Sequence, residues 1–501
     1  MAFELWQNIP FASILLPLAA AGVTSIMKPK LARRWCILVL TIVVAMSAIV
    51  SGFFYRGAES YTFMMGHYSA PWGNEIRAGA LEAATALFFA LIMLLSLLGG
   101  LKKIDEHIDE NKQSLYYVVI LLLTASLMAQ VYTNDIFTSY VFLEIMTLAA
   151  CALIAVRRRG RTLVAATRYM IMNLIGSGLF LLGIILLYDL TGHLLMQNMK
   201  EAVAALHATG QYSLPLTTVV ALMSIGLCIK SALFPFHTWV PDAYGFSTPT
   251  SSAVLSSLVS KGYIFLLMKI MYRVIGLDVI NATGVLDVLF VFAVVGTIMG
   301  SISAIRQNDV RRMIAFSSVA QIGYVYLGMG LGTDAGMMAA VFHIFAHAVC
   351  KAMLFLAAGG LADASGNSKI FRDLRGAGFR SPIAGVAFTI GALGMVGFPF
   401  LGGFASKLNL ALAAMEPLDV RSMLVLITLA VSTSLNTVYF LRTVITLYRK
   451  PLEGAEYPVE RGRRGFIFNA ALVAFSVLNV ALGLFSQQLV NMITSGLAMF
   501  G

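Results

Sequence analysis

Long apolar segments separated by short polar loops make up most of this chain. A window of about 19 residues finds fourteen of them, and each is close to or longer than the roughly 20 residues that a helix needs to cross a 30 Å hydrocarbon layer. The pattern predicts an all-α polytopic membrane protein with fourteen transmembrane helices. The segments cover residues 9–26, 35–54, 78–100, 114–132, 136–156, 166–188, 215–234, 247–271, 282–304, 313–331, 337–360, 382–414, 422–441 and 466–490.

Composition supports this interpretation and excludes several others. Of the 501 residues, 59% are hydrophobic and only 12% are Asp, Glu, Lys or Arg, about half the charged fraction of a soluble protein. The net charge of +11 comes with no nucleic-acid-binding motif, so no nucleic acid is expected as a partner. The four cysteines lie in apolar segments without CxxC spacing, which predicts neither disulfides nor a metal site.

The basic residues predict how the chain is oriented. If the loop after the first span is cytoplasmic, 25 of the 35 Lys and Arg residues fall on the cytoplasmic side. By the positive-inside rule, both termini then lie outside a prokaryotic cell membrane. The run RRRGR at 157–161 is interpreted as a topology anchor, with attraction of anionic lipid or an acidic partner as the alternative. The mixed-charge segment 102–112 is expected to be a solvated loop.

Five lysines remain within the spans. Lys269 lies near the outer end of its helix and is expected to reach the interface. The others are too deep for that, and an ammonium at mid-membrane costs about 2.5–3.5 kcal/mol. One deep carboxylate, Glu144, can pair with a lysine and shift its protonation. Asp287, near the end of its span, is a second candidate, with an interfacial position as the equal alternative. The alternative is a static ion pair joining two helices. The four deep lysines are Lys230, Lys261, Lys351 and Lys407.

Two spans are predicted to be broken inside the membrane. Pro235 follows Lys230 by five residues, and the glycine-rich stretch around Pro399 precedes Lys407 by eight. Proline removes a backbone donor, so the helix unwinds and frees carbonyls beside each lysine. Interrupted helices in both halves of a membrane protein are typical of inverted repeats.

His343, His347 and Lys351 recur every four residues in VFHIFAHAVCKAMLF and therefore share one helical face. Imidazole both donates and accepts protons near neutral pH, which favours a proton wire. Polar packing between helices and a metal site are the alternatives, although the zinc signature HExxH is absent. His237 is a candidate for the same polar chain. The remaining histidines are expected to be solvated in loops: His67, His107, His193 and His207.

Several of these motifs resemble a known family. The segments LCIKSALFPFHTWVPDAYGFSTPTSSAVLSSLVSKGY, FLEIMTLAACALIA, HIFAHAVCKAMLFLAAGG and GFPFLGGFASK are similar to the antiporter-like subunits of respiratory complex I, membrane-bound hydrogenases and Mrp-type Na⁺/H⁺ antiporters. The resemblance implies two inverted five-helix repeats, helices 4–8 and 9–13, with helices 7 and 12 broken. The corresponding divisions are 1–112 (helices 1–3), 113–275, 276–445 and 446–501 (helix 14).

The resemblance also implies roles for the deep polar residues. Glu144 on helix 5 would pair with Lys230 on broken helix 7. A proton would enter from the cytoplasm to Lys261 past Ser256, Ser257 and Ser260, pass through His343, His347 and Lys351, and leave from Lys407 toward the outside.

The resemblance is expected to be strongest to the D-type component of an Mrp antiporter, because helix 12 carries a lysine and the sequence has no long lateral helix after helix 14. A proton-pumping component of complex I or of a hydrogenase is the alternative, and a non-pumping structural component is an alternative of another class. Expected partners are other membrane proteins of the same complex, the lipid bilayer, H⁺ and, as a question left open, Na⁺. No cofactor is expected, since the sequence shows neither a dinucleotide-binding nor an iron–sulfur pattern.

Overall fold

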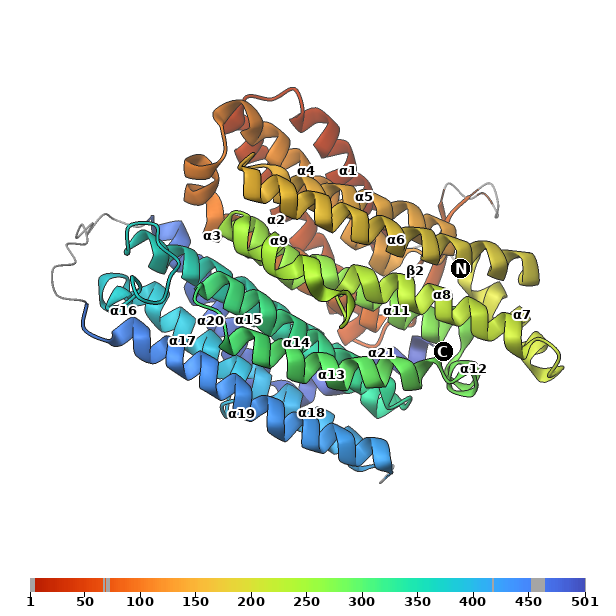
Figure 1. The fold of residues 1–501 in the computed structure, drawn as a ribbon. Helices are drawn as coiled ribbons and strands as arrows, with labels where there is room; N and C mark the ends of the chain where they lie inside the picture. Colours follow the sequence, from red (N-terminus) through yellow and green to blue (C-terminus); the bar gives the residue numbers. More distant parts are fainter. Residues whose placement is uncertain (1–4, 66–67, 69–72, 417–418, 452–464, 501) are drawn as a thin grey trace.

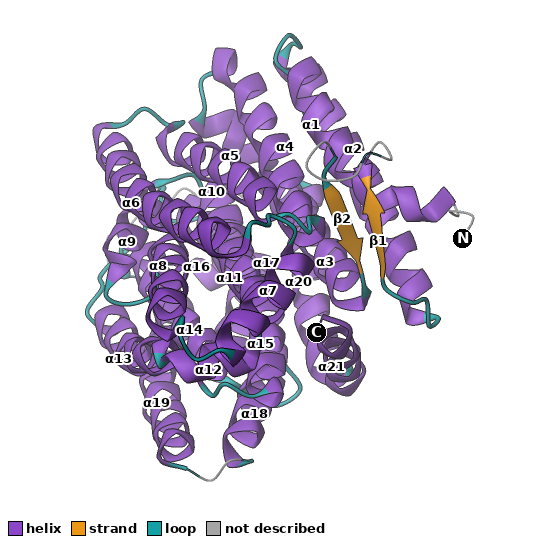
Figure 2. Ribbon diagram, turned by 90° about the vertical axis from the view of Figure 1, so that its right-hand side faces the viewer, coloured by secondary structure: helices purple, strands orange, loops and turns teal. Residues whose placement is uncertain are grey.

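The computed structural model describes residues 5–65, 68, 73–416, 419–451 and 465–500. His67 and three of the basic residues used for orientation, Arg461, Arg463 and Arg464, lie outside the described residues. The long helices run side by side in one elongated bundle (Figure 1), and many of them are seen end-on in the perpendicular view (Figure 2).

Thirteen helices of the described part of the chain are long and apolar enough to cross a membrane. A fourteenth segment is divided into α17 (Pro382–Val396) and α18 (Gly402–Met415), so fourteen transmembrane segments with helix 12 broken are confirmed. The continuous helices are α1 (Ile9–Thr24), α2 (Pro29–Tyr55), α3 (Ala80–His107), α4 (Glu110–Tyr132), α5 (Ile136–Ala155), α6 (Gly160–Thr191), α13 (Val285–Ile305), α14 (Val310–Gly330), α15 (Asp334–Asp363), α19 (Val420–Tyr448) and α20 (Phe466–Leu484).

The two remaining spans are assembled from shorter pieces. Helix 7 consists of α8 (Ser213–Ser231), a 3₁₀ turn η3 (Phe236–Trp239) and α9 (Val240–Phe246). Helix 8 consists of α10 (Pro249–Val254), α11 (Ser260–Ile270) and two π turns, η4 (Leu255–Val259) and η5 (Met271–Ile275). Short elements complete the fold: η1 (Leu5–Asn8), α7 (Met196–Ala208), α12 (Leu277–Thr283), α16 (Ala377–Arg380), α21 (Ser486–Phe500) and the antiparallel strands β1 (Tyr61–Met64) and β2 (Glu75–Ala78).

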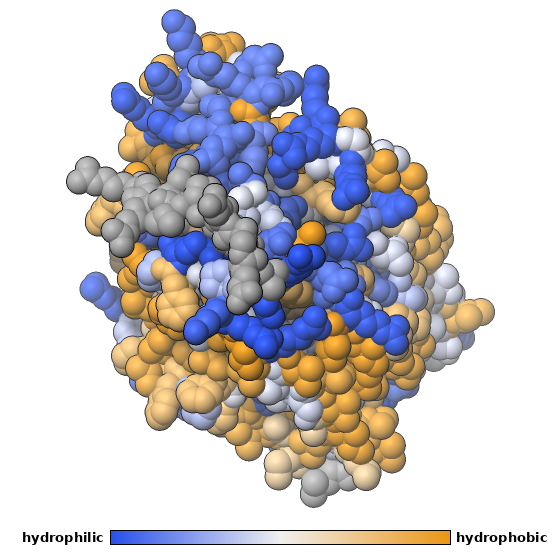
Figure 3. Space-filling view, turned by 60° about the vertical axis from the view of Figure 1, so that its left-hand side comes forward, coloured by the Kyte–Doolittle hydropathy of each residue, from blue (hydrophilic) through white to orange (hydrophobic). Residues whose placement is uncertain are grey.

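Burial separates central from peripheral helices. The apolar windows of helix 8 and α15 are entirely buried, and that of α14 almost so, whereas those of α6 and α19 are less than half buried. Large apolar side chains such as Ile185 and Ile427 point outward from the peripheral helices. In Figure 3, hydrophilic side chains gather at one end of the molecule while hydrophobic ones cover the adjoining flank. A surface of this kind is stable against lipid, so the chain is a multi-pass membrane protein.

The helix ends sort onto two opposite faces. One cavity is lined by the end of α3, the link between α5 and α6, the start of α14 and the end of α15. Another is lined by α7, α12, the start of α15 and the residue after α18. Since α4 follows the end of α3 while α13 follows α12, the two five-helix repeats begin at opposite ends, as inverted repeats require. The residue boundaries proposed for the four divisions remain predictions.

Two local expectations were wrong. Residues 102–107 are the last turn and a half of α3, and α4 begins at Glu110, so segment 102–112 is not a solvated loop. Lys103 is buried there because its ammonium pairs with Glu106 at 2.6 Å and with Asp363. His107, likewise expected to be solvated, ends α3 with a buried Nδ1.

Helix 14 also differs from its prediction. The apolar segment 466–490 ends as α20 at Leu484, and α21 continues after a break at Phe485. The start of α3 packs on α21, where the Cβ that Gly496 lacks would lie 2.6 Å from Leu81. The carbonyls of Met499 and Phe500 accept hydrogen bonds from Arg77 and Arg273. Both arginines are buried.

Candidate functional site

Lys230 is the penultimate residue of α8, directly before the helix breaks. Ala232 adopts a left-handed conformation, with φ +67°, and Pro235 cannot donate a backbone hydrogen bond. The break predicted from the sequence is therefore confirmed. The Lys230 side chain is fully buried, and its ammonium donates to the hydroxyl of Thr147 at 2.8 Å.

Glu144 on α5 faces this lysine. Its Oε1 lies 3.5 Å from Lys230 Nζ and accepts a hydrogen bond from the Ser177 hydroxyl. The lysine is completely enclosed, whereas the glutamate side chain remains 24% exposed on the flank of the bundle. The two partners expected from the sequence are thus in contact, with the carboxylate at the outer side of the pair.

Lys261 is fully buried and is the second residue of α11, which follows the π turn η4. Its ammonium donates to the carbonyl of Ser256 at 2.5 Å and to the hydroxyl of Ser260 at 3.1 Å. A π turn shifts the backbone hydrogen bonds by one residue and so leaves a carbonyl free to accept from a side chain. The irregular helix supplies the oxygen that holds this lysine.

Hydrogen-bonding groups of η4 and α14 lie between Lys261 and Lys351. The hydroxyls of Ser256 and Ser318 are 3.0 Å apart, and Ser318 donates to the carbonyl of Ile314 at 3.0 Å. Lys351 Nζ donates to the same carbonyl at 3.1 Å and also to Ser317. Lys261 binds the backbone carbonyl of Ser256 and not its hydroxyl, so these hydrogen bonds do not run unbroken from one lysine to the other.

The two histidines precede Lys351 on the same helix, α15. The rings of His343 and His347 stack with centroids 5.8 Å apart, and His343 Nδ1 hydrogen-bonds the Ser406 hydroxyl at 2.7 Å. The ring of Tyr324 contacts the ring of His343. The ammonium of Lys407 lies 5.3 Å from the centre of the Tyr324 ring. Among the described residues neither ring nitrogen of His347 has a hydrogen-bond partner, and no group of three metal-binding side chains occurs.

Lys407 lies on α18, just after the second break, and its side chain reaches back toward the break. Gly397 ends α17 in a left-handed conformation with φ +95°, and Phe400 follows with φ +68°. Lys407, on α18, donates back to the carbonyl of Val396 at 2.8 Å and to Thr433 at 3.0 Å. The lysine thereby binds a carbonyl at the end of the preceding half-helix, where the helix dipole favours a cation.

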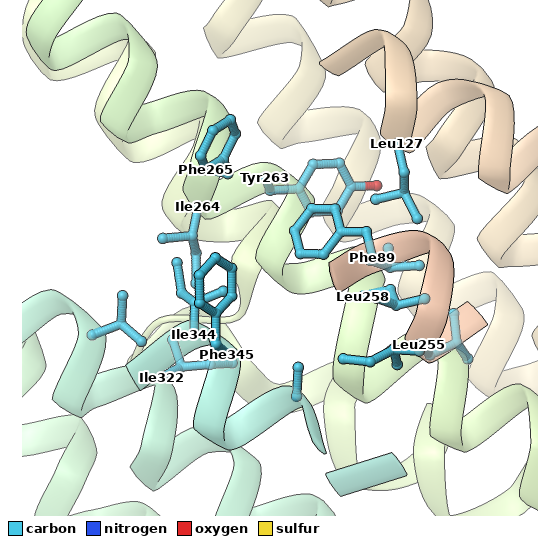
Figure 4. Close-up of a cluster of buried hydrophobic side chains, with 14 of the residues drawn as sticks. Phe89, Leu127, Leu255, Leu258, Tyr263, Ile264, Phe265, Ile322, Ile344 and Phe345 are labelled. Atoms are coloured by element: carbon cyan, nitrogen blue, oxygen red, sulfur yellow. The ribbon is translucent and has the colours of Figure 1, made fainter. Parts of the chain in front are cut away.

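The site combines cations with an apolar enclosure. Within the described ranges only Lys230, of the four deep lysines, has a carboxylate in ion-pair contact. Buried hydrophobic side chains from α3, α4, α11, α14 and α15 pack into one cluster (Figure 4), in which Ile264 lies near Ile344 and Phe345. In such surroundings a change of charge at one lysine acts strongly on the next.

Two residues fall outside these expectations. The ring of His237 stacks on Phe234 at 5.2 Å, and the structure gives it no contact with the lysine chain. Lys269 does not reach the interface, as was expected, but is fully buried. Its ammonium donates to the carbonyls of Gln130, Val131 and Thr133, the open end of α4. These carbonyls satisfy the hydrogen bonding of the ammonium inside the protein, so the side chain turns inward and not toward the interface.

Sequence reasoning missed a fully buried carboxylate. Glu82, in the first turn of α3, is fully buried and pairs with Arg77 at 2.5 Å. A glutamate inside a predicted apolar span, five residues after an arginine, was the available signal. Asp287, by contrast, is exposed at the bundle end and pairs with Arg421, in agreement with an interfacial position.

Comparisons with known proteins identify the family to which the chain belongs. The family described as NADH:quinone oxidoreductase/Mrp antiporter, TM, matches residues 133–436, which include all seven candidate relay residues. The chain belongs to this family. Among curated relatives, the N-type component of the NADH-quinone oxidoreductase of Desulforudis audaxviator is 33% identical, with 97% of each chain covered. The D-type component of the Na⁺/H⁺ antiporter of Bacillus subtilis is 26% identical, covering 95% of this chain and 94% of the relative.

Solved structures show the same fold. A chain of an archaeal membrane-bound sulfane sulfur reductase superimposes with a TM-score of 0.85, at 26% identity and 97% coverage of both chains. A chain of the Mrp complex of Dietzia sp. DQ12-45-1b also gives 0.85, at 22% identity, covering 99% of this chain and 97% of the other. A chain of respiratory complex I from Thermus thermophilus gives 0.72, at 22% identity, with 96% and 100% covered. The protein is an antiporter-like subunit of the complex I/Mrp superfamily.

Proposed function

We propose that this antiporter-like subunit translocates protons through the buried chain formed by Glu144, Lys230, Lys261, Lys351 and Lys407, with His343 and His347 between the last two lysines. The observation that carries the proposal is that Lys261, Lys351 and Lys407 are held by hydroxyls and carbonyls rather than by carboxylates. A purely structural lysine at this depth would be expected to have a fixed counter-charge.

Neutral oxygen partners suit a group that gains and loses a proton. A backbone carbonyl accepts from the N–H groups of a charged or a neutral lysine, and a serine hydroxyl can reverse its role to donate to a neutral amine. The same partners therefore hold a lysine in both protonation states. The pair of Glu144 and Lys230 would supply the control, because its separation removes a counter-charge beside the chain.

The partly exposed Glu144 also favours assembly with another membrane protein. A carboxylate on the flank of a transmembrane bundle is costly against lipid, and a neighbouring subunit would cover it. We place the complex in the cytoplasmic membrane of a prokaryote, with proton entry toward Lys261 from the cytoplasm and exit beyond Lys407.

Two kinds of complex are supported by different observations. The Mrp-type assignment, in which a D-type component moves protons in exchange for Na⁺, is favoured by the Bacillus subtilis relative, which is 26% identical over 95% of this chain, and by Lys407. Assignment to NADH-quinone oxidoreductase, as its N-type component, is favoured by the relative that is 33% identical along almost its whole length. Purifying the complex from its native membrane and identifying its subunits separates the two: redox subunits identify an oxidoreductase, and their absence beside cation-antiporter subunits identifies an Mrp complex.

The relay is tested by neutralising its controlling pair. In proteoliposomes holding the intact complex, Lys230→Ala and Glu144→Ala should each lower proton movement at least about tenfold. Opposite charges about 4 Å apart attract by roughly 4 kcal/mol at an effective dielectric of 20, well above the roughly 1.4 kcal/mol that a factor of ten requires.

Asp287→Asn and Arg421→Gln serve as matched controls, because they remove an exposed ion pair at the bundle end that contacts none of the relay lysines. The rate of proton movement by complexes with either substitution should stay within about twofold of the rate of the unmodified complex. Unchanged proton movement in both Lys230→Ala and Glu144→Ala, with normal assembly, would refute the relay.

A further inference from the structure

A cavity of about 410 Å³ opens at the end of the bundle that the basic residues place in the cytoplasm. It lies where the N-terminal helices meet both repeats, and none of the relay residues lines it. Nine of its twelve lining residues are polar or charged. The lining consists of Lys103, Glu106, His107, Arg157, Arg159, Pro249, Arg311, Gly359, Ala362, Asp363, Asn367 and Lys369.

The charges around this cavity do not balance. Lys103 is neutralised by its contacts with Glu106 and Asp363. The other four cations, Arg157, Arg159, Arg311 and Lys369, form no ion pair with any carboxylate in the part of the chain that the structure describes. The wall of the cavity therefore carries an excess of positive charge.

Three of these cations are held in place by the end of one short helix. Arg311 donates to the carbonyls of Tyr244 and Ser247, Lys369 to that of Gly245 at 2.9 Å, and Arg157 to that of Phe246 at 3.2 Å. These four consecutive carbonyls close α9. They orient the cations and carry partial negative charge, but they supply no full counter-charge.

Some polar atoms of this wall have no partner. Arg311 is only 2% exposed, and its Nε is buried without a hydrogen bond among the described residues. The same holds for Arg157 Nε and for His107 Nδ1. Buried polar groups are normally satisfied, so the wall leaves hydrogen-bonding capacity of its arginines and of His107 unused among the described residues.

The pKa values of two cations that line the cavity also reflect the excess of positive charge. Burial, and then the neighbouring charge of Arg311, lower the pKa of Lys369 to about 7, with Arg157 and Arg159 acting in the same direction and Asp309 opposing them. Burial and the charge of Arg159 also lower the pKa of Arg157. An anion in the cavity would relieve this repulsion.

We propose that this cavity binds a phosphate group, either free phosphate or the headgroup of an anionic phospholipid. Guanidinium groups recognise phosphate oxygens through paired, charge-assisted hydrogen bonds, and two arginines and a lysine fixed on one helix end form such a cradle. Only Pro249, Gly359 and Ala362 are apolar in the lining, so lipid acyl chains would remain outside. The site is distinct from the proton relay, and its occupancy is measured by binding rather than by proton movement.

The test measures phosphate binding to the purified full-length chain in a phosphate-free detergent, by calorimetric titration at constant ionic strength. Arg157→Gln combined with Arg159→Gln should weaken the affinity about tenfold or more, since a charge-assisted hydrogen bond contributes at least that much. Arg158→Gln is the matched control, because Arg158 belongs to the same basic run but is exposed and does not line the cavity. Its affinity should stay within about twofold.

Lys369→Gln is a second, milder variant for the case that the double variant does not fold. Like the double variant, it should weaken phosphate binding several-fold. The source of the phosphate is distinguished in nanodiscs. If the free ion is the ligand, phosphate binds equally in phosphatidylcholine and phosphatidylglycerol discs. If a headgroup is the ligand, phosphatidylglycerol is retained through purification and excludes inorganic phosphate.

Three results would overturn the proposal: no binding of either phosphate or phosphatidylglycerol, equal weakening by Arg158→Gln and the double variant, or loss of phosphate binding when the complete complex is assembled. The last result would assign the cavity to an acidic segment of a partner protein.

Discussion

At the scale of single residues, three of the buried lysines bind carbonyls at irregular points of the helices. Lys261 binds a carbonyl within a π turn, Lys407 binds a carbonyl at the end of a half-helix, and Lys269 binds the open end of α4. Lys351 differs, because it binds the carbonyl of Ile314 inside the continuous helix α14 together with the hydroxyl of Ser317. Helix ends and π turns are therefore frequent, but not necessary, partners of a buried lysine in this fold.

Lys269 provides a test of this principle outside the relay. Lys269→Met keeps the length of the side chain but leaves the carbonyls of Val131 and Thr133 without a donor, which should destabilise the protein by about 1–3 kcal/mol. The apparent melting temperature in one detergent should fall measurably below that of the unmodified chain.

Lys102→Met is the matched control, since the Lys102 side chain is 60% exposed and its contact with Glu106 is long, at 3.5 Å. Its melting temperature should hardly change, because an exposed pair contributes less than about 1 kcal/mol. Equal stability of the two variants would mean that Lys269 does not hold the end of α4.

The sequence located a lysine where it stands in the middle of an apolar segment or close to a predicted helix break. Lys261 and Lys351 stand near mid-segment, and Lys230 and Lys407 stand near Pro235 and Pro399, so their cost in a bilayer is evident. Lys269 and Glu82 stand near segment ends, where the sequence cannot distinguish a side chain that turns to water from one that turns inward. That choice is made by partners elsewhere in the fold, Thr133 and Arg77 respectively.

At the scale of elements, both breaks are encoded by residues that cannot continue a helix, and both were found. Pro235 lacks a donor, and Gly397 takes up a backbone conformation that side chains resist. The π turn η4 was not predicted, because its sequence LSSLV contains neither proline nor glycine. Tertiary contacts, such as that between Ser256 and Ser318, accompany it.

Gly397→Ala should damage the second break. At φ +95° a Cβ costs roughly 1–2 kcal/mol, and it would lie 3.1 Å from Lys407 Cδ, close enough to displace slightly the side chain that holds the Val396 carbonyl. We expect a lower melting temperature together with reduced proton movement by the complex.

Gly178→Ala is the corresponding control inside a continuous helix. No neighbouring atom lies within 4 Å of the Cβ position at Gly178 in α6, and alanine is preferred to glycine there by up to about 1 kcal/mol. This variant should be as stable as the parent or more so. If Gly397→Ala behaves in the same way, the break does not depend on the left-handed glycine.

At the scale of the whole molecule, the orientation in the membrane remains a prediction based on the basic residues. Thr209 lies between α7 and α8, toward the cavity that Lys200 lines, whereas Arg306 lies between α13 and α14, toward the opposite end. The positive-inside rule places Thr209 outside and Arg306 in the cytoplasm.

Single cysteines at these positions test the orientation. The four natural cysteines form no disulfide and would be replaced first. In intact cells a membrane-impermeant maleimide should label Thr209→Cys, and it should label Arg306→Cys only after the membrane is opened. The reverse pattern would invert the entry and exit sides of the proposed relay.

The continuous helix α15 carries three relay residues and is enclosed along its whole apolar length. A piston-like shift of this helix would have to break its packing against several neighbours at once, because cores behave as close-packed solids. We therefore expect α15 to stay fixed while other parts of the bundle move. Any movement that accompanies the proposed proton transfer is then left to side-chain rotation at His343 and His347 and to the two interrupted helices, which end inside the bundle at Ser231 and Val396.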